Sequence, residues 1–84
     1  MVGKRRDKFE IIQDLLEIAD NPKGARKTNL VYRSNLNFNR LENFLPFLIE
    51  KDLIQHSDED EGVYLTTPKG RQFLKQLKSM YDSL

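Results

Sequence analysis

The spacing of apolar residues predicts an amphipathic helix over residues 7–19. Asp7 stands at the position of a helix cap, and Glu10 follows three residues later, which is the pairing of a capping box. Polar residues and Gly24 then predict a turn over residues 20–24. The apolar residues of the helix recur at intervals of three and four, so they are predicted to form one buried face: Phe9, Ile12, Leu15, Leu16 and Ala19.

A short strand over residues 25–27 and a second helix over 28–35 are predicted next. Thr28 is expected to cap this helix, because threonine oxygen accepts hydrogen bonds from the first turn. Asn35 is expected to end it, since asparagine tolerates the left-handed conformation of a helix C-terminus. The residues of this helix predicted to face the core are Leu30 and Val31, with Tyr32 as a further candidate.

A third helix is predicted over residues 38–51, with Asn37 as its cap. Pro46 lies inside it and removes one helical hydrogen bond, at a cost of about 3 kcal/mol. We therefore expect either a kink at Pro46, with the Glu42 carbonyl unpartnered, or two shorter helices that meet there. The apolar face of this segment consists of Leu41, Phe44, Leu45, Leu48 and Ile49.

The following pattern predicts two strands, over residues 53–56 and 63–66, joined by a polar turn over 57–62. Thr67 and Pro68 then mark the start of a last helix, because threonine caps well and proline fits the first helical position. The alternation in the second strand leaves two arrangements open, in which the core faces either Val63 and Leu65 or Tyr64 and Thr66.

The last helix is predicted over about residues 68–83 and carries a heptad-like stripe. This stripe either packs on the first helix or forms a homodimer interface, and the chain length leaves both uses open. Its members are Gly70, Leu74, Leu77, Tyr81 and Leu84, with Phe73 and Met80 beside them.

Length and composition limit the function classes. The 84 residues predict a single domain over residues 1–84, and no apolar run is long enough to cross a membrane. With no cysteine and one histidine, no metal site or other cofactor is expected. The sequence contains no nucleophile–base set and no glycine-rich phosphate loop, so we predict that the protein is not an enzyme. A cytoplasmic location is expected.

Charge is distributed unevenly along the chain. The net charge is +1, but residues 1–40 carry +4 and residues 41–84 carry −3. No acidic residue occurs over residues 21–41, where five basic residues lie. Such a stretch is typical of a phosphate-binding surface, although chance clustering explains the charge pattern equally well.

Several segments together resemble small archaeal winged-helix proteins. Residues 28–37 (TNLVYRSNLN) resemble their helix-turn-helix, residues 50–54 (EKDLI) the exit of the third helix, and residues 67–74 (TPKGRQFL) the start of the last helix. The resemblance covers residues 5–82. It implies a mainly α fold with a small β-hairpin, namely a winged helix-turn-helix with a three-helix core, a wing and a C-terminal helix. It also implies DNA-binding regulators or chromatin-associated proteins, many of which dimerise through the C-terminal helix.

Three features depart from that family, one of which is a final helix shorter than in its coiled-coil members. Asp52 stands where the family has glycine, although aspartate also adopts the left-handed conformation. The turn at residues 58–61 is Asp-Glu-Asp-Glu, which phosphates would repel. The acidic turn favours a second hypothesis, in which the domain is a protein–protein interaction adaptor that does not bind DNA.

If the partner is double-stranded DNA, the helix starting near Phe38 enters the major groove. Asparagine pairs with adenine and arginine with guanine, so Asn39, Arg40 and Asn43 are the candidate base contacts. No small-molecule ligand is expected, and the protein would be nucleoid-associated. Candidate contacts to the DNA backbone are Lys27, Thr28, Asn29, Arg33 and Asn37, with a further basic arm at Lys4, Arg5 and Arg6. Lys69 and Arg71 near the last helix are candidate anchors for the backbone from the far side.

Overall fold

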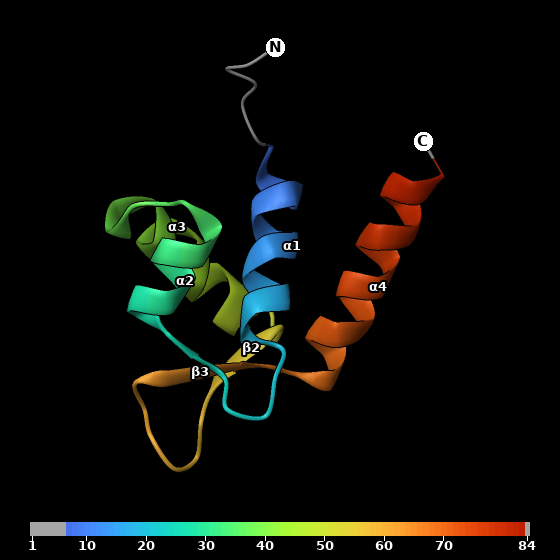
Figure 1. Ribbon diagram of the computed structural model, residues 1–84. Helices are drawn as coiled ribbons and strands as arrows, with labels where there is room; N and C mark the ends of the chain where they lie inside the picture. The colour runs from blue at the N-terminus through green and yellow to red at the C-terminus, as the bar shows by residue number, and fades with distance from the viewer. Residues whose placement is uncertain (1–6, 84) are drawn as a thin grey trace.

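The computed structural model describes residues 7–83, and the basic arm and Leu84 lie outside this range. Within it, four helices accompany a small three-stranded sheet (Figure 1). The fold class predicted from the sequence is thereby confirmed. The elements, in chain order, are α1 (Lys8–Ala19), β1 (Ala25–Arg26), α2 (Lys27–Ser34), α3 (Phe38–Glu50), β2 (Ile54–His56), β3 (Val63–Thr66) and α4 (Pro68–Asp82).

The sheet has the strand order β1-β3-β2, and both pairs of neighbours are antiparallel. Tyr64 in the central strand lies opposite both Ala25 and His56. Tyr64 and Thr66 are buried, whereas Val63 and Leu65 are partly exposed. The structure thus selects the second of the two arrangements that the alternation had left open.

Three helix caps follow the sequence prediction. The Asp7 carboxylate accepts from the Glu10 N–H at 2.9 Å, and the Glu10 carboxylate accepts from the Asp7 N–H at 3.3 Å. Asn37 accepts from the Arg40 N–H at 2.7 Å at the start of α3. Thr67 accepts from the Gly70 N–H at 2.8 Å at the start of α4. Each bond satisfies an amide that the first helical turn leaves without a partner.

The predicted Thr28 cap is wrong. Helix α2 begins at Lys27, and Arg26 occupies the cap position without a side-chain hydrogen bond. Arg26 is paired with Val63 in the sheet, which holds it extended at φ −91° and ψ 164°. The chain therefore passes from strand to helix without a polar cap, and the predicted strand ends one residue early.

The core lies between α1, α2, α3 and the inner face of the sheet. Phe9 is 44% exposed, so its predicted burial is wrong, while Ile11 is buried instead. Tyr32 is also exposed, so its candidate place on the core face of α2 is wrong. At 3.6 residues per turn, Phe9 lies about 90° from the centre of the buried face of α1. The residues on that face are Ile11, Ile12, Leu15, Leu16 and Ala19.

Helix α3 continues through Pro46, so the alternative of two shorter helices is wrong. Proline has no N–H, and the Glu42 carbonyl therefore lacks its helical partner. A bend at this point stays a prediction. The chain leaves α3 through Asp52, which adopts the left-handed conformation at φ 62°, as its position in the sequence indicated.

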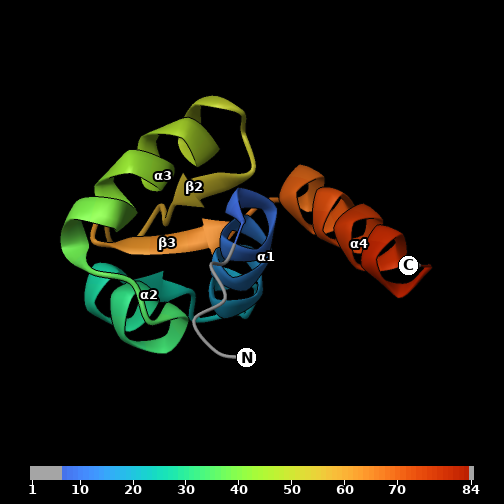
Figure 2. The same cartoon turned by 90° about the horizontal axis from the view of Figure 1, so that it is seen from above.

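Helix α4 packs on α1 and projects away from α2 and the hairpin (Figures 1 and 2). Gly70, Leu74 and Leu77 of the predicted stripe are buried against the domain, whereas Met80 is 49% exposed. Packing of α4 on the first helix, and of Gly70 against Leu53 and Thr66, accounts for this part of the stripe. No helix in the described residues is long and apolar enough to span a membrane.

Candidate nucleic-acid interface

Helices α2 and α3 pack together and are joined by the turn at residues 35–37, which makes them a helix-turn-helix. Asn35 ends α2 in the left-handed conformation at φ 61°, as predicted. The Ser34 hydroxyl donates to the Leu30 carbonyl within the buried side of α2. These local bonds fix the angle at which α3 leaves the turn.

The predicted base contacts lie together on the N-terminal half of α3. Asn39, Arg40 and Asn43 are all exposed, and Asn39 and Asn43 are one helical turn apart. The Arg40 guanidinium carbon lies 5.9 Å from the centre of the Phe44 ring. Within residues 7–83, neither asparagine side chain has a hydrogen-bond partner and Arg40 has no ion pair. The polar groups of this surface are available to base edges.

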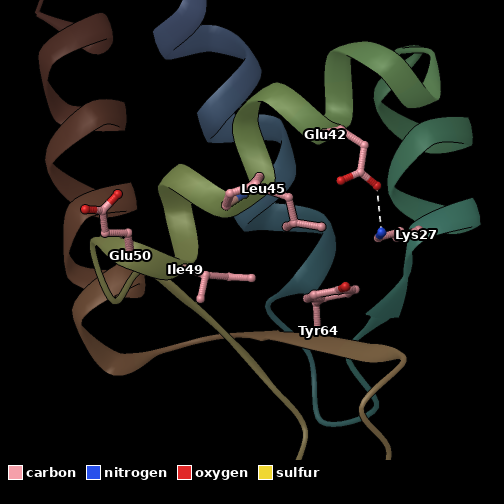
Figure 3. Close-up of a pocket in the computed structure, with 7 residues that line it drawn as sticks. Lys27, Glu42, Leu45, Ile49, Glu50 and Tyr64 are labelled. Atoms are coloured by element: carbon pink, nitrogen blue, oxygen red, sulfur yellow. Dashed lines mark hydrogen bonds and ion pairs between the residues drawn. The ribbon is translucent and has the colours of Figure 1, made fainter.

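Lys27 lies on the α3 side of α2. Its ammonium nitrogen is 2.6 Å from the Glu42 carboxylate on α3 (Figure 3). The hydrogen bond to Glu42 raises the pKa of Lys27, so the cation is maintained but already paired. This pairing was not predicted, and the sequence offers no signal for it because the two residues belong to different helices.

An apolar groove of about 340 Å³ separates α3 from β3. Leu45, Ile49 and Tyr64 line it, with the Lys27–Glu42 pair and Glu50 at its rim (Figure 3). Its lining thus includes one cation and two carboxylates, and the groove is weakly acidic. The C-terminal half of α3 is therefore chemically distinct from the half that carries the candidate base contacts.

The remaining predicted backbone contacts are distributed around α2. Asn29 and Arg33 lie one turn apart and line a polar hollow of about 660 Å³ between α2, β1 and the end of α1. Thr28 and Asn37 are exposed elsewhere on the helix-turn-helix. The structure does not unite these residues in one patch, because Lys27 faces α3 and Asn29 and Arg33 face away from it.

The hairpin turn at residues 57–62 is acidic and internally bonded. The Asp60 carboxylate accepts from the Gly62 N–H at 2.9 Å and forms an ion pair with Arg26 at 2.5 Å. These two partners lower the pKa of Asp60. His56 is exposed, and its Nδ1 lies 2.8 Å from the Glu61 carbonyl oxygen. Asp60 is thus paired with Arg26, while the other acidic residues of the turn keep its tip negatively charged.

The sequence comparisons agree with this architecture. The family model described as "Winged helix-turn-helix" matches residues 5–84. The chain belongs to the winged helix-turn-helix family. It is also 32% identical over 77 residues to the uncharacterized protein MJ0290 of Methanocaldococcus jannaschii. The match covers 92% of this chain and 35% of that relative, so the chain spans about a third of the relative's length.

Proposed function

We propose that this winged helix-turn-helix domain binds double-stranded DNA as a transcriptional regulator or chromatin-associated protein. The observation that carries the proposal is the exposed polar surface formed by Asn39, Arg40 and Asn43 at the start of α3. In a helix-turn-helix this part of the second helix reaches base edges in the major groove. Amide and guanidinium groups make bidentate hydrogen bonds there with adenine and guanine.

The backbone contacts in this proposal come from Lys27, Thr28, Asn29, Arg33 and Asn37. Lys27 reaches a phosphate only by exchanging its bond with Glu42, whereas Arg33 has no ion pair within residues 7–83. Asn37 uses its side-chain oxygen as a helix cap, and its amide group remains as a donor. The candidate residues around α2 are therefore expected to contribute unequally to binding of the DNA backbone.

The proposal treats residues 1–84 as one domain without enzymatic activity, associated with the nucleoid in the cytoplasm. It includes a homodimer through α4, in keeping with the family resemblance. The exposed Met80 supports this use, since it lies in the last turn of α4 and is not buried against the domain.

A protein-interaction adaptor is the second candidate function. It is supported by the apolar groove beside α3 and by Phe47, which is 44% exposed on the same helix. Exposed apolar surface next to a groove is a common feature of protein-binding sites. The acidic turn of the wing also suits a protein surface better than a phosphate backbone.

Fluorescence anisotropy with mixed-sequence duplex DNA, titrated over a range of salt concentrations, tests the proposal. We expect the logarithm of the binding constant to fall linearly with the logarithm of salt, with a slope of about −0.9 for each phosphate neutralised. Absence of binding at low salt would reject the DNA proposal and favour the adaptor.

A further inference from the structure

The polar hollow beside α2 lies on the side of this helix that faces the end of α1 and strand β1, and the turn at residues 21–24 forms one of its walls. Lys23 stands on that wall, and Asn29 and Arg33 stand on α2. Lys23 was not among the residues predicted to bind DNA, although it belongs to the acid-free stretch over residues 21–41.

The acidic residues around the hollow are already paired. The Glu17 carboxylate lies 2.8 Å from the Lys78 ammonium of α4. The Asp60 carboxylate of the wing forms its ion pair with Arg26. Within residues 7–83, neither Lys23 nor Arg33 has an ion pair, and both are exposed. The hollow therefore has two cations that are not compensated by the domain itself.

The turn that carries Lys23 is held in place. The Asn21 amide donates to the Ile18 carbonyl at 3.0 Å, and the Asn21 side-chain oxygen accepts from the Lys23 N–H at 2.9 Å. Gly24 adopts a left-handed conformation at φ 67°, and a Cβ atom at this position would lie 2.5 Å from the Tyr64 carbonyl oxygen. The backbone of Lys23 is thus anchored to α1 and to the sheet.

The shape of the hollow favours an extended anion over a single enclosed ion. Its volume is about 660 Å³, against about 340 Å³ for the groove beside α3. Lys23, Asn29 and Arg33 are exposed around an open space, where none of them encloses a small ion. Asn29 adds an uncharged donor, since its side chain has no hydrogen bond within residues 7–83. Phosphodiester groups along a DNA strand match this arrangement.

We propose that the hollow is a separate DNA-backbone contact, in which Lys23, Asn29 and Arg33 hold phosphates on the side of α2 that faces α1. This inference rests on the proposed function, because it assigns a strand of the bound duplex to the hollow. It separates two tasks: α3 selects bases, and the hollow between α2 and α1 holds phosphates.

The test is a double substitution, Lys23→Gln with Arg33→Gln, assayed by anisotropy against salt with a preferred and a mixed duplex. Each lost phosphate contact should make the salt slope shallower by about 0.9, so we expect a change of nearly two units. Affinity should fall by the same factor on both duplexes, because backbone contacts carry no base information.

The matched control is Lys51→Gln with Lys75→Gln. It removes the same charge from exposed positions that have no ion pair within residues 7–83 and do not line the hollow. We expect its slope to equal that of the unmodified protein. Circular dichroism of both variants should show unchanged helix content, since all four side chains are exposed.

The possible failures are distinguishable. If the unmodified protein binds DNA but the double variant keeps its salt slope, the hollow is not a backbone contact and the proposed function stands. Equal slope changes in the double variant and the control would also reject the hollow, because total charge would then explain the effect. If the unmodified protein binds no DNA, both the proposed function and the hollow are rejected.

Discussion

The groove beside α3 and the hollow outside α2 border the same helix pair and differ in chemistry. The groove is lined by apolar side chains, and its charged residues are one lysine and two glutamates. The hollow is lined mainly by polar groups, with three cations and one glutamate. The two sides of one helix-turn-helix therefore present different chemistry.

Internal pairing sharpens this difference. Lys27 at the groove is bound to Glu42, so the groove presents no uncompensated cation. At the hollow, the only acidic lining residue among those described is Glu17, and it forms an ion pair with Lys78 of α4. Arg33 therefore has no acidic partner there. A count of basic residues would rank Lys27 and Arg33 equally as phosphate contacts. They differ because Lys27 has an ion pair with Glu42, whereas Arg33 has none within residues 7–83.

The largest expected effect is a loss of stability of the helix pair that borders both the groove and the hollow. Leu30 is fully buried in α2 and belongs to the core on which α2 and α3 pack. Leu30→Ala should lower the free energy of unfolding by about 2–5 kcal/mol, because it leaves a cavity where the two helices meet the core. Chemical denaturation followed by circular dichroism measures this loss.

Tyr32→Ala is the control on the same helix, because Tyr32 is 87% exposed. Its effect on the free energy of unfolding should stay within about 0.5 kcal/mol. Equal losses in the two variants would contradict the assignment of Leu30 to the core.

The next largest effect concerns discrimination between DNA sequences, as distinct from electrostatic attraction to the DNA backbone. Arg40→Ala should reduce discrimination between the preferred and mixed duplexes by about 1–3 kcal/mol, because a guanidinium reads guanine through two hydrogen bonds. Competition anisotropy with the two duplexes measures it. Unchanged discrimination would remove Arg40 from the base contacts, whereas loss of discrimination in Lys23→Gln would contradict the division between α3 and the hollow.

The smallest expected effect is a change in DNA affinity on altering the rim of the groove. Glu42→Gln removes a carboxylate from the helix-turn-helix and leaves Lys27 without its ion pair. We expect a few-fold tighter DNA binding and a salt slope that is steeper by up to about one unit, as one further phosphate contact forms. The double variant Lys27→Gln with Glu42→Gln should lose the added slope. Weaker binding of Glu42→Gln would show that the ion pair orders the interface and does not oppose binding.

The sequence by itself determined the elements that depend on local bonds. Asp7, Asn37 and Thr67 were identified as caps because each satisfies amides within three residues of itself. The exposure of Asn39 and Asn43 followed from helical periodicity, since Leu41 and Leu45 occupy the opposite face. The candidate base contacts could therefore be placed together before the fold was known.

Tertiary structure decided the features that join distant parts of the chain. The side of β3 that faces the core was open until Tyr64 and Thr66 were found buried. The Lys27–Glu42 pair joins residues 15 apart, and the Arg26–Asp60 pair joins residues 34 apart. Charge pattern identified the basic stretch, but only the packing of α1, α2 and α4 determined which of its cations are neutralised. Local periodicity fixes which way a side chain points, whereas the neighbour it meets depends on how the elements pack.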